Sequence, residues 1–400
     1  MSEAILILNA GSSSIKFALF LRSAGDPVLR CRGVLDEHDA QPRLTISDPS
    51  AGILHDHLRD AADPSGEALL ADALRWIDGE LDGGVLAAVG HRVVHGGPDF
   101  VAPVRLTASI VAALQALTPL APLHQPRCLS PIRTMMSLRP AVPQVACFDT
   151  AFHHGLAPPI SRFALPRRFE LEGIRRYGFH GLSFEYIAGR LRELSPELAG
   201  KRTVVAHLGN GASLCAMQGG ISIDTTMGLT PLDGLVMGTR SGAIDPGVLL
   251  FLQQQKGLSA DEVERLLYRE SGLLGVSGLS SDMRELLASD DPRAAQAVEL
   301  FCFRCAREIA AMANSLAGFE CLVFTGGIGE HAAPIRRMIC ERLRWLGVEI
   351  DQAANQRADS CISSQTSRVD VHVLPTDEEA MIARHCENAL NHRFHPPAVS

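Results

Sequence analysis

The chain has 400 residues, 46% of which are hydrophobic, and it carries a formal net charge of −8. This length favours two domains over one, and the hydrophobic content is enough for a buried core in each, which excludes a disordered chain. The negative charge gives no overall attraction to nucleic acid or to anionic lipid, so we expect neither as a partner. Lysine occurs only at Lys16, Lys201 and Lys256, so a cluster that binds anions must depend mainly on arginine.

The N-terminus and the cysteines indicate the compartment. Acidic Glu3 and a very short apolar run do not match a signal peptide. The longest apolar stretch, residues 109–123, is interrupted by polar residues and prolines, so we expect it not to span a membrane. The ten cysteines follow no disulfide framework, and Cys302-x-x-Cys305 stands in a helical pattern, which favours core packing over a redox or metal site. We therefore expect a soluble cytoplasmic protein.

The chain begins with two apolar runs, residues 4–9 and 15–21, joined by the turn Ala10-Gly11-Ser12-Ser13-Ser14. A common phosphate loop leads from a strand into a helix and contains Gly-Lys-Ser/Thr, whereas the second run here is rich in residues that favour strands. The sequence therefore predicts a hairpin whose turn offers backbone N–H groups to a phosphate.

A second segment, residues 203–220, has the same design, with a strand, Asn210, a Gly/Ser turn and another strand. Two such hairpins indicate a duplicated domain with one phosphate loop in each half, the arrangement of actin-like and sugar-kinase-like ATPases. The alternative is that two hairpins resemble each other by chance.

Further along the chain, strands and helices alternate, which is typical of an α/β protein. The helix predicted at 292–317 has apolar residues at spacings of three and four, as an amphipathic core helix should. The predicted strands cover residues 4–9, 15–21, 85–94, 143–148, 202–208, 212–217, 320–325 and 370–374. The predicted helices cover residues 66–79, 107–117, 182–194, 260–269, 292–317, 333–346 and 377–391.

A third glycine cluster, Thr325-Gly326-Gly327-Ile328-Gly329-Glu330, follows the strand predicted at 321–324. We expect a loop here and a helix that begins near Ala333. A single glycine-rich loop is a weak signal. Its place after a strand, in the half of the chain that contains the second hairpin, favours a site for adenosine.

Several polar residues have positions that suggest chemistry. Arg92 lies at a strand-to-turn junction in GHRVVHGG, and Arg240 lies between glycines in GTRSG; an ordinary ion pair is the alternative for each. Asp149 follows the strand at 143–148, where α/β proteins gather acidic groups, and with Asn9 it is expected to orient Mg²⁺. His180 precedes a glycine, although a single histidine is more often a satisfied polar residue than a catalyst.

Other histidines fit no metal site. His91 and His95 have the spacing of a zinc motif, but Arg92 replaces the glutamate of H-E-x-x-H and the intervening valines favour a strand. We expect the pairs His153–His154 and His55-x-His57 to lie in solvent.

Residues Thr376–Glu379, TDEE, form a second acidic cluster at a predicted helix start. They match a capping box, in which Thr376 is the N-cap and Glu379 is the third helical residue. This role accounts for Glu379 and leaves Glu378 free to face a cleft as the carboxylate on the magnesium side.

Together these motifs resemble the acetate kinase family of short-chain carboxylate kinases. The matching stretches are LNAGSSSIKF, GHRVVHGG, FDTAFH, RRYGFHG, HLGNGAS, DTTMGLTPLDGLVMGTRSGAIDPG, FTGGIGE and PTDEEAMIA, which span residues 5–383. The resemblance implies two duplicated actin-like (ribonuclease H-like) α/β domains with a nucleotide cleft between them. Domain I would comprise residues 1–150 and 381–400, and domain II residues 151–380. It also implies a homodimer and reversible, Mg²⁺-dependent phosphoryl transfer between ATP and acetate.

The resemblance also implies roles for individual residues. Arg92 and Arg240 would hold the carboxylate and the transferring phosphoryl group, and His180 would donate a hydrogen bond to that group in the transition state. Asn9, Asp149 and Glu378 would bind or orient Mg²⁺, for which Mn²⁺ is a possible substitute. The acetate pocket would be lined by Val94, Leu123, Phe179 and Pro231. ATP would contact Ser12, Lys16, His207, Leu208, Gly209, Asn210, Gly211, Asp282, Met283, Arg284, Gly327, Ile328, Gly329 and Glu330.

The chain departs from the family in a few places, notably a compact segment at Gly155–Phe169 and Phe184 where a histidine is usual. Two further functions stay open. A propionate or butyrate kinase of the same family would differ only in a small apolar pocket. Such a pocket distinguishes two substrates that differ by one methylene group by only about 1–3 kcal/mol of binding free energy. A non-metabolic actin-like or chaperone-type ATPase would have no need of Arg92 and Arg240 beside such a pocket.

Overall fold

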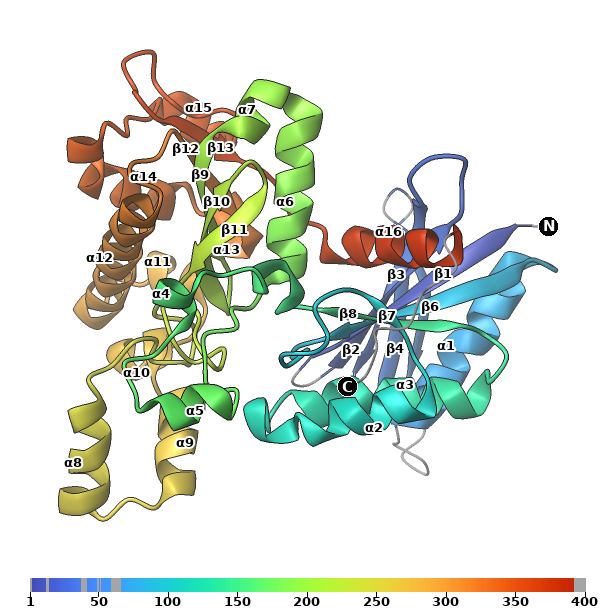
Figure 1. Ribbon diagram of the computed structural model, residues 1–400. Helices are drawn as coiled ribbons and strands as arrows, with labels where there is room; N and C mark the ends of the chain where they lie inside the picture. Colours follow the sequence, from blue (N-terminus) through green and yellow to red (C-terminus); the bar gives the residue numbers. More distant parts are fainter. Residues whose placement is uncertain are drawn as a thin grey trace. The chain divides into compact units, whose positions relative to one another are not determined.

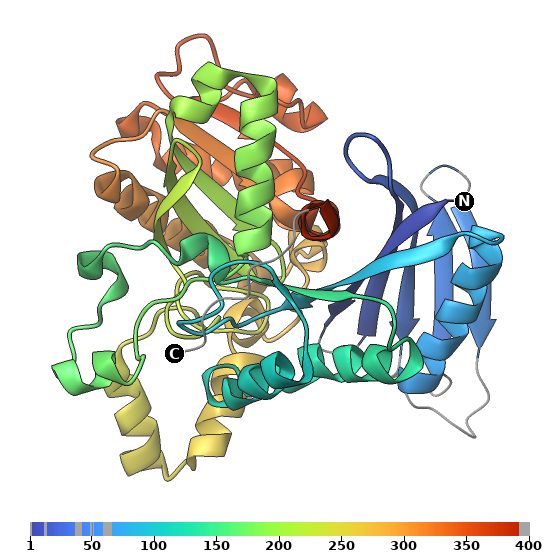
Figure 2. The same ribbon diagram turned by 45° about the vertical axis from the view of Figure 1, so that its right-hand side comes forward.

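The structure, a computed structural model, describes residues 2–11, 14–36, 42–48, 50, 52–58 and 66–391. Ser12, which was predicted to contact ATP, lies outside the described residues. The chain divides into two units (Figures 1 and 2): unit 1 comprises Met1–Ala151 and Asp377–Ser400, and unit 2 comprises Phe152–Thr376. The chain thus passes from unit 2 back to unit 1 four residues before the predicted boundary at residue 381.

Unit 1 contains one mixed sheet with the strand order β5-β4-β3-β2-β1-β6-β8-β7. The first hairpin supplies β1 and β2, which pair antiparallel, and β1 also pairs in parallel with β6, which pairs in parallel with β8. The strands are β1 (Glu3–Ala10), β2 (Ser14–Leu21), β3 (Val28–Asp36), β4 (Arg43–Asp48), β5 (Gly52–Leu58), β6 (Val85–Val93), β7 (Val104–Arg105) and β8 (Gln144–Phe148).

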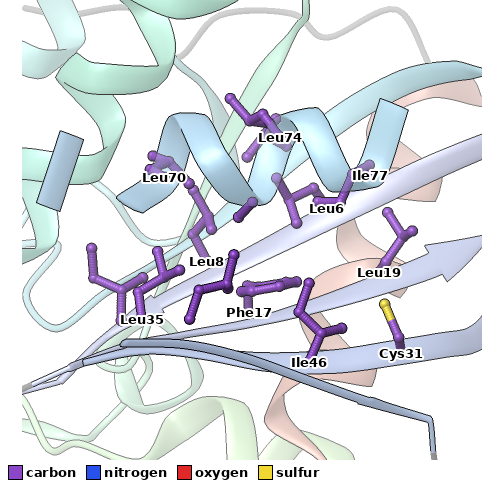
Figure 3. Packing of buried hydrophobic residues seen from close by; sticks show 14 of the residues in the cluster. Leu6, Leu8, Phe17, Leu19, Cys31, Leu35, Ile46, Leu70, Leu74 and Ile77 are labelled. Carbon is purple, nitrogen blue, oxygen red and sulfur yellow. The ribbon is translucent and has the colours of Figure 1, made fainter. Parts of the chain in front are cut away.

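Helices cover both faces of this sheet (Figure 1). Helices α1 (Gly66–Leu81) and α3 (Gln125–Leu138) pack on one face, and α16 (Glu378–Asn391) packs against β1, β6 and β8 on the other. Helix α2 (Ala108–Ala116) packs beside α3. Because strand side chains alternate between faces, Leu6 and Phe17 join the core under α1, which Figure 3 shows. On the opposite face, a Cβ atom on Gly90 would lie 2.5 Å from Ile382, so α16 contacts β6 at the bare backbone.

Unit 2 contains a five-stranded sheet with the order β11-β10-β9-β12-β13. Figures 1 and 2 show α6 on one face and the long helix α12 on the other. The strands are β9 (Arg202–Leu208), β10 (Ala212–Gln218), β11 (Ile221–Thr225), β12 (Cys321–Thr325) and β13 (Asp370–Val373). The helices are α4 (Pro158–Ser161), α5 (Arg167–Leu171), α6 (Gly181–Leu194), α7 (Pro196–Gly200), α8 (Pro246–Lys256), α9 (Ala260–Arg269), α10 (Gly272–Ser277), α11 (Met283–Ala288), α12 (Pro292–Ser315), α13 (Gly326–His331), α14 (Ala333–Arg342) and α15 (Gln352–Arg357).

The two sheets share one topology. In unit 1 the strands β3-β2-β1-β6-β8 pair antiparallel, antiparallel, parallel and parallel, and β11-β10-β9-β12-β13 of unit 2 pair in the same sequence. The two hairpins occupy equivalent places, β1–β2 and β9–β10. The internal duplication that was predicted from the hairpins is therefore confirmed.

Every strand and helix that was predicted is present, and most of their ends agree within two residues. Helix α14 ends at Arg342, four residues before the predicted end at residue 346. Helix α3 was missed, since it contains Pro131, and an interior proline typically destabilises a helix by about 3 kcal/mol. The burial of Leu129, Ile132 and Met135 compensates for that loss. In the described part of the chain no helix is long and apolar enough to span a membrane.

We predict opposite effects for two glycine-to-alanine substitutions in unit 1. Gly33 of β3 lies opposite Phe17, and a Cβ atom there would come within 2.2 Å of the buried ring. Gly33→Ala should lower the free energy of unfolding by about 1–3 kcal/mol, the usual effect of an overpacked core. Gly79 lies on the exposed side of α1 with nothing within 4 Å, so Gly79→Ala should raise stability by about 0.5–1 kcal/mol. Urea unfolding of both variants measures this, and a Gly33→Ala protein as stable as the parent would contradict the packing.

Candidate active site

The predicted polar residues of unit 1 meet at one edge of its sheet. Asn9 lies near the end of β1, Arg92 near the end of β6, and Asp149 directly after β8. These strands are neighbours and run parallel, so their carboxyl ends share an edge. Arg92 joins the group: its Nε and Nη2 donate to the two carboxylate oxygens of Asp149 at 2.9 and 2.6 Å, and its Nη1 donates to Asn9 Oδ1 at 3.3 Å.

Burial and charge act in opposite directions on this cluster. Asp149 is almost fully buried, and Arg92 is largely buried. Burial disfavours the charged guanidinium, but the carboxylates of Asp149 and Glu378 outweigh it and raise the pKa of Arg92 above its usual value. Glu378 reaches the cluster from the first turn of α16, with its Oε2 3.6 Å from Arg92 Nε. Glu378 therefore lies beside Arg92, and its place on the magnesium side stays a prediction.

The predicted capping box at the start of α16 is wrong. The N-cap is Asp377, whose Oδ1 accepts a hydrogen bond from Ala380 N at 2.8 Å. Glu379 does not fold back on the chain, because its Oε2 accepts from Arg32 Nε at 2.7 Å. Thr376 bonds Ser183 through its hydroxyl group at 2.8 Å instead. Threonine and aspartate are both good N-caps, so the sequence alone did not separate these two helix starts.

In unit 2, the second hairpin gathers His180 and Arg240 around Gly211. His180 adopts a left-handed backbone conformation, with φ 57°, at the N-cap of α6, and its Nδ1 is 2.9 Å from Ser213 Oγ. A Cβ atom on Gly211 would lie 3.2 Å from His180 Nε2 and 3.3 Å from Arg240 Nη2. Two nitrogen-bearing side chains therefore approach the backbone of the turn, where a side chain at residue 211 would crowd them.

The segment that carries Arg240 is fixed by close backbone contacts. Arg240 Nη1 donates to Pro231 O at 2.7 Å, which leaves Nη2 directed toward Gly211. A Cβ atom on Gly238 would lie 1.9 Å from Asn210 Oδ1, so the segment passes against the hairpin tip only because residue 238 is glycine. Arg176 Nη1 also donates to three successive carbonyl oxygens, those of Thr225, Thr226 and Met227. These contacts explain the long glycine-rich motif at 224–247.

His207 lies beside His180 at the end of β9. The two imidazole rings stack with a centroid separation of 4.4 Å and an interplanar angle of 22°. His207 Nδ1 is 2.8 Å from Ser183 Oγ, which is 2.8 Å from Thr376 Oγ1. Two hydroxyl-bearing residues thus fix the orientation of His207, which in turn packs on His180.

The predicted glycine-rich loop at 325–330 is wrong in its local structure, because Gly326–His331 forms the short helix α13. Gly326 has φ +76°, and a Cβ atom there would lie 2.8 Å from Leu208 O. Arg336, which is 1% exposed, donates to Gly329 O and Glu330 O, each at 2.8 Å. The α13 segment is therefore held at both ends, close to the second hairpin.

The remaining predicted contacts for ATP are spread along the chain. Lys16 lies on β2 opposite Asn9, and Leu208, Gly209 and Asn210 belong to the second hairpin. Asp282 is the N-cap of α11 and pairs with Arg284, and their hydrogen bonds lower the pKa of Asp282 to about 2. The side chain of Met283 is buried. Gly327 and Ile328 lie within α13.

The residues predicted to line the acetate pocket divide between the units. Val94 and Leu123 belong to unit 1, and Phe179 and Pro231 belong to unit 2. Val94, Phe179 and Pro231 are buried, and Phe179 O accepts a hydrogen bond from His153 Nε2. Pro231 contacts the site directly through its carbonyl group and Arg240.

The structure offers oxygen ligands of the kind that Mg²⁺ uses. The described residues include no group of three or more His, Cys, Asp or Glu side chains arranged to hold a metal ion. The donors in unit 1 are the amide oxygen of Asn9 and the carboxylates of Asp149 and Glu378, all in contact with Arg92. Mg²⁺ usually takes one or two carboxylates and completes its shell with water and phosphate oxygens, so this donor set fits it.

Several residues that shape the site were not predicted. Ser213 and Ser183 orient predicted histidines, and Arg336 holds the backbone of Gly329 and Glu330. Arg176 holds carbonyl groups near the start of the 224–247 motif. Arg336 could have been noticed, because it interrupts the apolar face of its helix. His153 was predicted to lie in solvent, but it is buried between Ser222 Oγ at 2.7 Å and Phe179 O at 3.1 Å, and burial lowers its pKa to about 4.

Solved structures share this fold. An acetate kinase from Porphyromonas gingivalis superimposes with a TM-score of 0.86 and 35% identity, over 97% of this chain and all of that one. A propionate kinase from Francisella tularensis gives a TM-score of 0.88 and 37% identity, over 96% and 98% of the two chains. The duplicated sheets and the paired hairpins thus define a kinase of the actin-like α/β class.

Comparison of sequences defines the family. Residues 4–384 match the Acetokinase family. The chain is 51% identical to an acetate kinase of Rhodopseudomonas palustris over 391 residues, which cover 96% of this chain and 98% of that protein. It is 52% identical to an acetate kinase of Rhizobium meliloti over 384 residues, 96% and 97% of the two chains. The chain belongs to the acetokinase family.

We predict that Asp377, and not Thr376 or Glu379, determines the stability of the start of α16. Asp377→Ala removes the cap on Ala380 N and a 2.7 Å ion pair with Arg32, so it should lower the free energy of unfolding by about 0.5–2 kcal/mol. Asp377→Asn keeps the cap and should lose less. Glu379→Ala removes one partly exposed ion pair and should lower the free energy of unfolding by only about 0–1 kcal/mol. Chemical denaturation ranks the three variants, and a larger loss for Glu379→Ala would restore the capping box.

Proposed function

We propose that the protein transfers the γ-phosphoryl group of ATP to acetate, reversibly and in line, giving acetyl phosphate and ADP. The observation that carries this proposal is the approach of His180 Nε2 and Arg240 Nη2 to the glycine turn of the second hairpin. Membership of the acetokinase family and the acetate kinase relatives support it.

The chemistry fits these side chains. Acetate is already an anion, so no general base is needed; what the reaction requires is the alignment of two anions and the stabilisation of charge on the equatorial oxygens of the phosphoryl group. Arg240 and His180 would donate hydrogen bonds to those oxygens. Arg92 would hold the carboxylate through the second N–H group of a terminal nitrogen, since its Nε donates to Asp149 and each terminal nitrogen has one hydrogen bond, to Asn9 or to Asp149.

Asn9, Asp149 and Glu378 would hold Mg²⁺ together with ATP, and Mn²⁺ is a possible substitute. The ion, when bound, would neutralise phosphate charge and orient the nucleotide. Asp149 also balances the charge of Arg92, so its carboxylate would keep Arg92 in place in addition to serving the metal side. The backbone of α13 and of the second hairpin would receive the adenosine and phosphates.

Residue type alone does not select the acceptor, because the apolar residues Val94, Leu123, Phe179 and Pro231 would restrict its size without forming specific hydrogen bonds. Propionate is the second candidate acceptor, and the similarity to the Francisella tularensis propionate kinase favours it over other acids. One methylene group in an apolar pocket changes binding by about 1–3 kcal/mol, so both acids could react at different rates.

We also propose a homodimer in the cytoplasm. Helix α8 has no buried residue and exposes Leu250 and Phe251, each by more than half of its surface, which a second copy could cover. All ten cysteines are free thiols, which suits a reducing compartment. Light scattering in solution that gave the mass of a single chain would contradict the dimer.

The proposed activity is tested by offering acetate, propionate and butyrate to the purified enzyme with Mg²⁺ and ATP, and measuring ADP and acyl phosphate. We expect acetate to give the highest kcat/KM. A higher value for propionate would assign the second candidate function. ATP hydrolysis without acyl phosphate from any acid would exclude both.

We predict that Arg240 acts mainly in the transition state. Arg240→Ala should lower kcat by about 10³-fold or more, the scale of an arginine in phosphoryl transfer, with little change in ADP affinity. Arg240→Lys should rescue poorly, because the fork binds Pro231 O with one nitrogen while it presents another to Gly211. Arg265→Ala, which removes an exposed ion pair with Glu270, is the matched control. Turnover near the parent level in Arg240→Ala would refute the role.

We predict that substitutions of the adjacent residues Glu378 and Glu379 have different effects on the magnesium requirement of the enzyme. Glu378→Gln should keep the fold, lower kcat and raise the Mg²⁺ concentration needed for half-maximal rate, because a neutral amide is a weak ligand for a hard cation. Glu379→Gln should leave the magnesium requirement unchanged, since Glu379 pairs with Arg32. Magnesium titrations of both variants decide this, and the reverse order would overturn the assignment of Glu378.

A further inference from the structure

One carboxylate oxygen connects the α13 segment to the point where the chain leaves unit 2. Glu330 Oε1 accepts hydrogen bonds from Gly326 N at 2.9 Å, from Thr325 Oγ1 at 3.4 Å and from Thr376 N at 3.2 Å. Thr376 is the last residue of unit 2, and Asp377 is the first residue of the returning part of unit 1. Glu330 therefore holds the start of α13 and this crossover in a fixed relation.

The crossover is also tied to the residues around the second hairpin. Thr376 Oγ1 bonds Ser183 Oγ, and Ser183 Oγ bonds His207 Nδ1, each at 2.8 Å. His207 stacks on His180. A continuous series of contacts thus leads from α13 through Glu330 and Thr376 to the histidine that is proposed to act in phosphoryl transfer.

On the other side of the crossover, Asp377 is held by unit 1. Its carboxylate caps Ala380 N and pairs with Arg32. Thr376 and Asp377 are therefore each held by contacts within their own unit. A shift of α13 would therefore also displace Thr376, because Glu330 is bonded to both.

The surroundings of Glu330 favour a connecting role over a direct contact with ATP. Its Oε1 is occupied by three protein donors, and a carboxylate so placed would repel nucleotide phosphates. Arg336 holds the carbonyl groups of Gly329 and Glu330 from the other end of the helix. The α13 segment can therefore respond to a ligand as one rigid piece.

We propose that Glu330 is a positioning residue that transmits nucleotide binding at α13 to the crossover at Thr376, and through Ser183 and His207 to His180. This inference rests on the proposed function for the place of the nucleotide. It replaces the expectation that the Glu330 side chain contacts ATP.

Hydrogen exchange of the protein with and without Mg²⁺ and ADP tests the connection, with no need for phosphoryl transfer. In the parent protein, ADP should slow exchange of the Thr376 amide by about three- to tenfold, the scale of one strengthened hydrogen bond. Glu330→Ala should abolish this protection while the dissociation constant of ADP, from calorimetry, changes by less than about threefold, a net effect below one hydrogen bond. Glu330→Gln keeps an acceptor and the volume, and should retain part of the protection.

The matched control is Glu341→Ala, which removes an exposed carboxylate paired with Arg337 on α14 and should leave the protection intact. An absence of ADP-dependent protection in the parent, or protection that survives in Glu330→Ala, would overturn the proposal. A loss of ADP binding above tenfold in both Glu330 variants would assign Glu330 to direct nucleotide binding instead. Failure of the proposed function would appear differently, as a parent enzyme that binds ADP but forms no acyl phosphate.

Discussion

The ion pair between Arg92 and Asp149 is the interaction on which the organisation of unit 1 depends. Asp149 is almost completely buried, and a buried carboxylate without a partner would be strongly destabilising, so the guanidinium must stay in contact with it. That requirement fixes the carboxyl ends of β6 and β8 against each other. It also draws in Asn9 from β1 and Glu378 from α16. A structural necessity of the fold thereby assembles the oxygen donors that the proposed reaction uses.

In unit 2 the residues of the candidate site are held together by close packing of the backbone rather than by an ion pair. Gly211 admits His180 and Arg240, Gly238 admits the tip of the hairpin, and Gly326 lets α13 begin against Leu208 O. At each place a Cβ atom would meet its neighbour at 3.3 Å or less. The absence of a side chain at these glycines permits the close contacts. Residues 224–247 are constrained because a Cβ atom on Gly228, Gly234, Gly238 or Gly242 would lie within 2.8 Å of a neighbour.

The sequence predicted most of the fold because its strongest signals are local. Apolar runs predicted eight of the strands, although not β3, β4, β5, β7 or β11, and the two hairpins predicted the duplication, which the matching strand order confirms. Errors arose where tertiary contacts decide between similar local options. Helix α3 forms despite Pro131 because its apolar face is buried, and the N-cap of α16 is Asp377 rather than Thr376, which is engaged by Ser183 and Glu330.

The site shows the same division between what is local and what is not. Arg92, Asp149, Arg240 and His180 stand in distinctive motifs, and the structure brings the first two together in unit 1 and the last two together in unit 2. Ser183 and Ser213 were not predicted, since each acts on a partner that is distant in the sequence and neither differs in type from an ordinary helix or strand residue. His153 was misjudged for a related reason, because its burial depends on Ser222 and Phe179 rather than on its neighbours in the chain.

Because the two sheets are duplicates, equivalent positions in them can carry different side chains with different proposed roles. The equivalent strands β8 and β13 lead to Asp149 in one unit and to Thr376 in the other, and the equivalent strands β6 and β12 end near Arg92 and Gly326. The fold therefore supplies the positions twice, and the side chains give each copy a separate task. Carboxylates and an arginine gather in unit 1, where metal and acceptor are proposed to bind. Glycine backbone, two histidines and an arginine gather in unit 2, where the phosphates are proposed to lie. Thr376 is followed directly by Asp377 and by Glu378, so the end of unit 2 is joined covalently to the helix whose carboxylate is proposed to hold the metal.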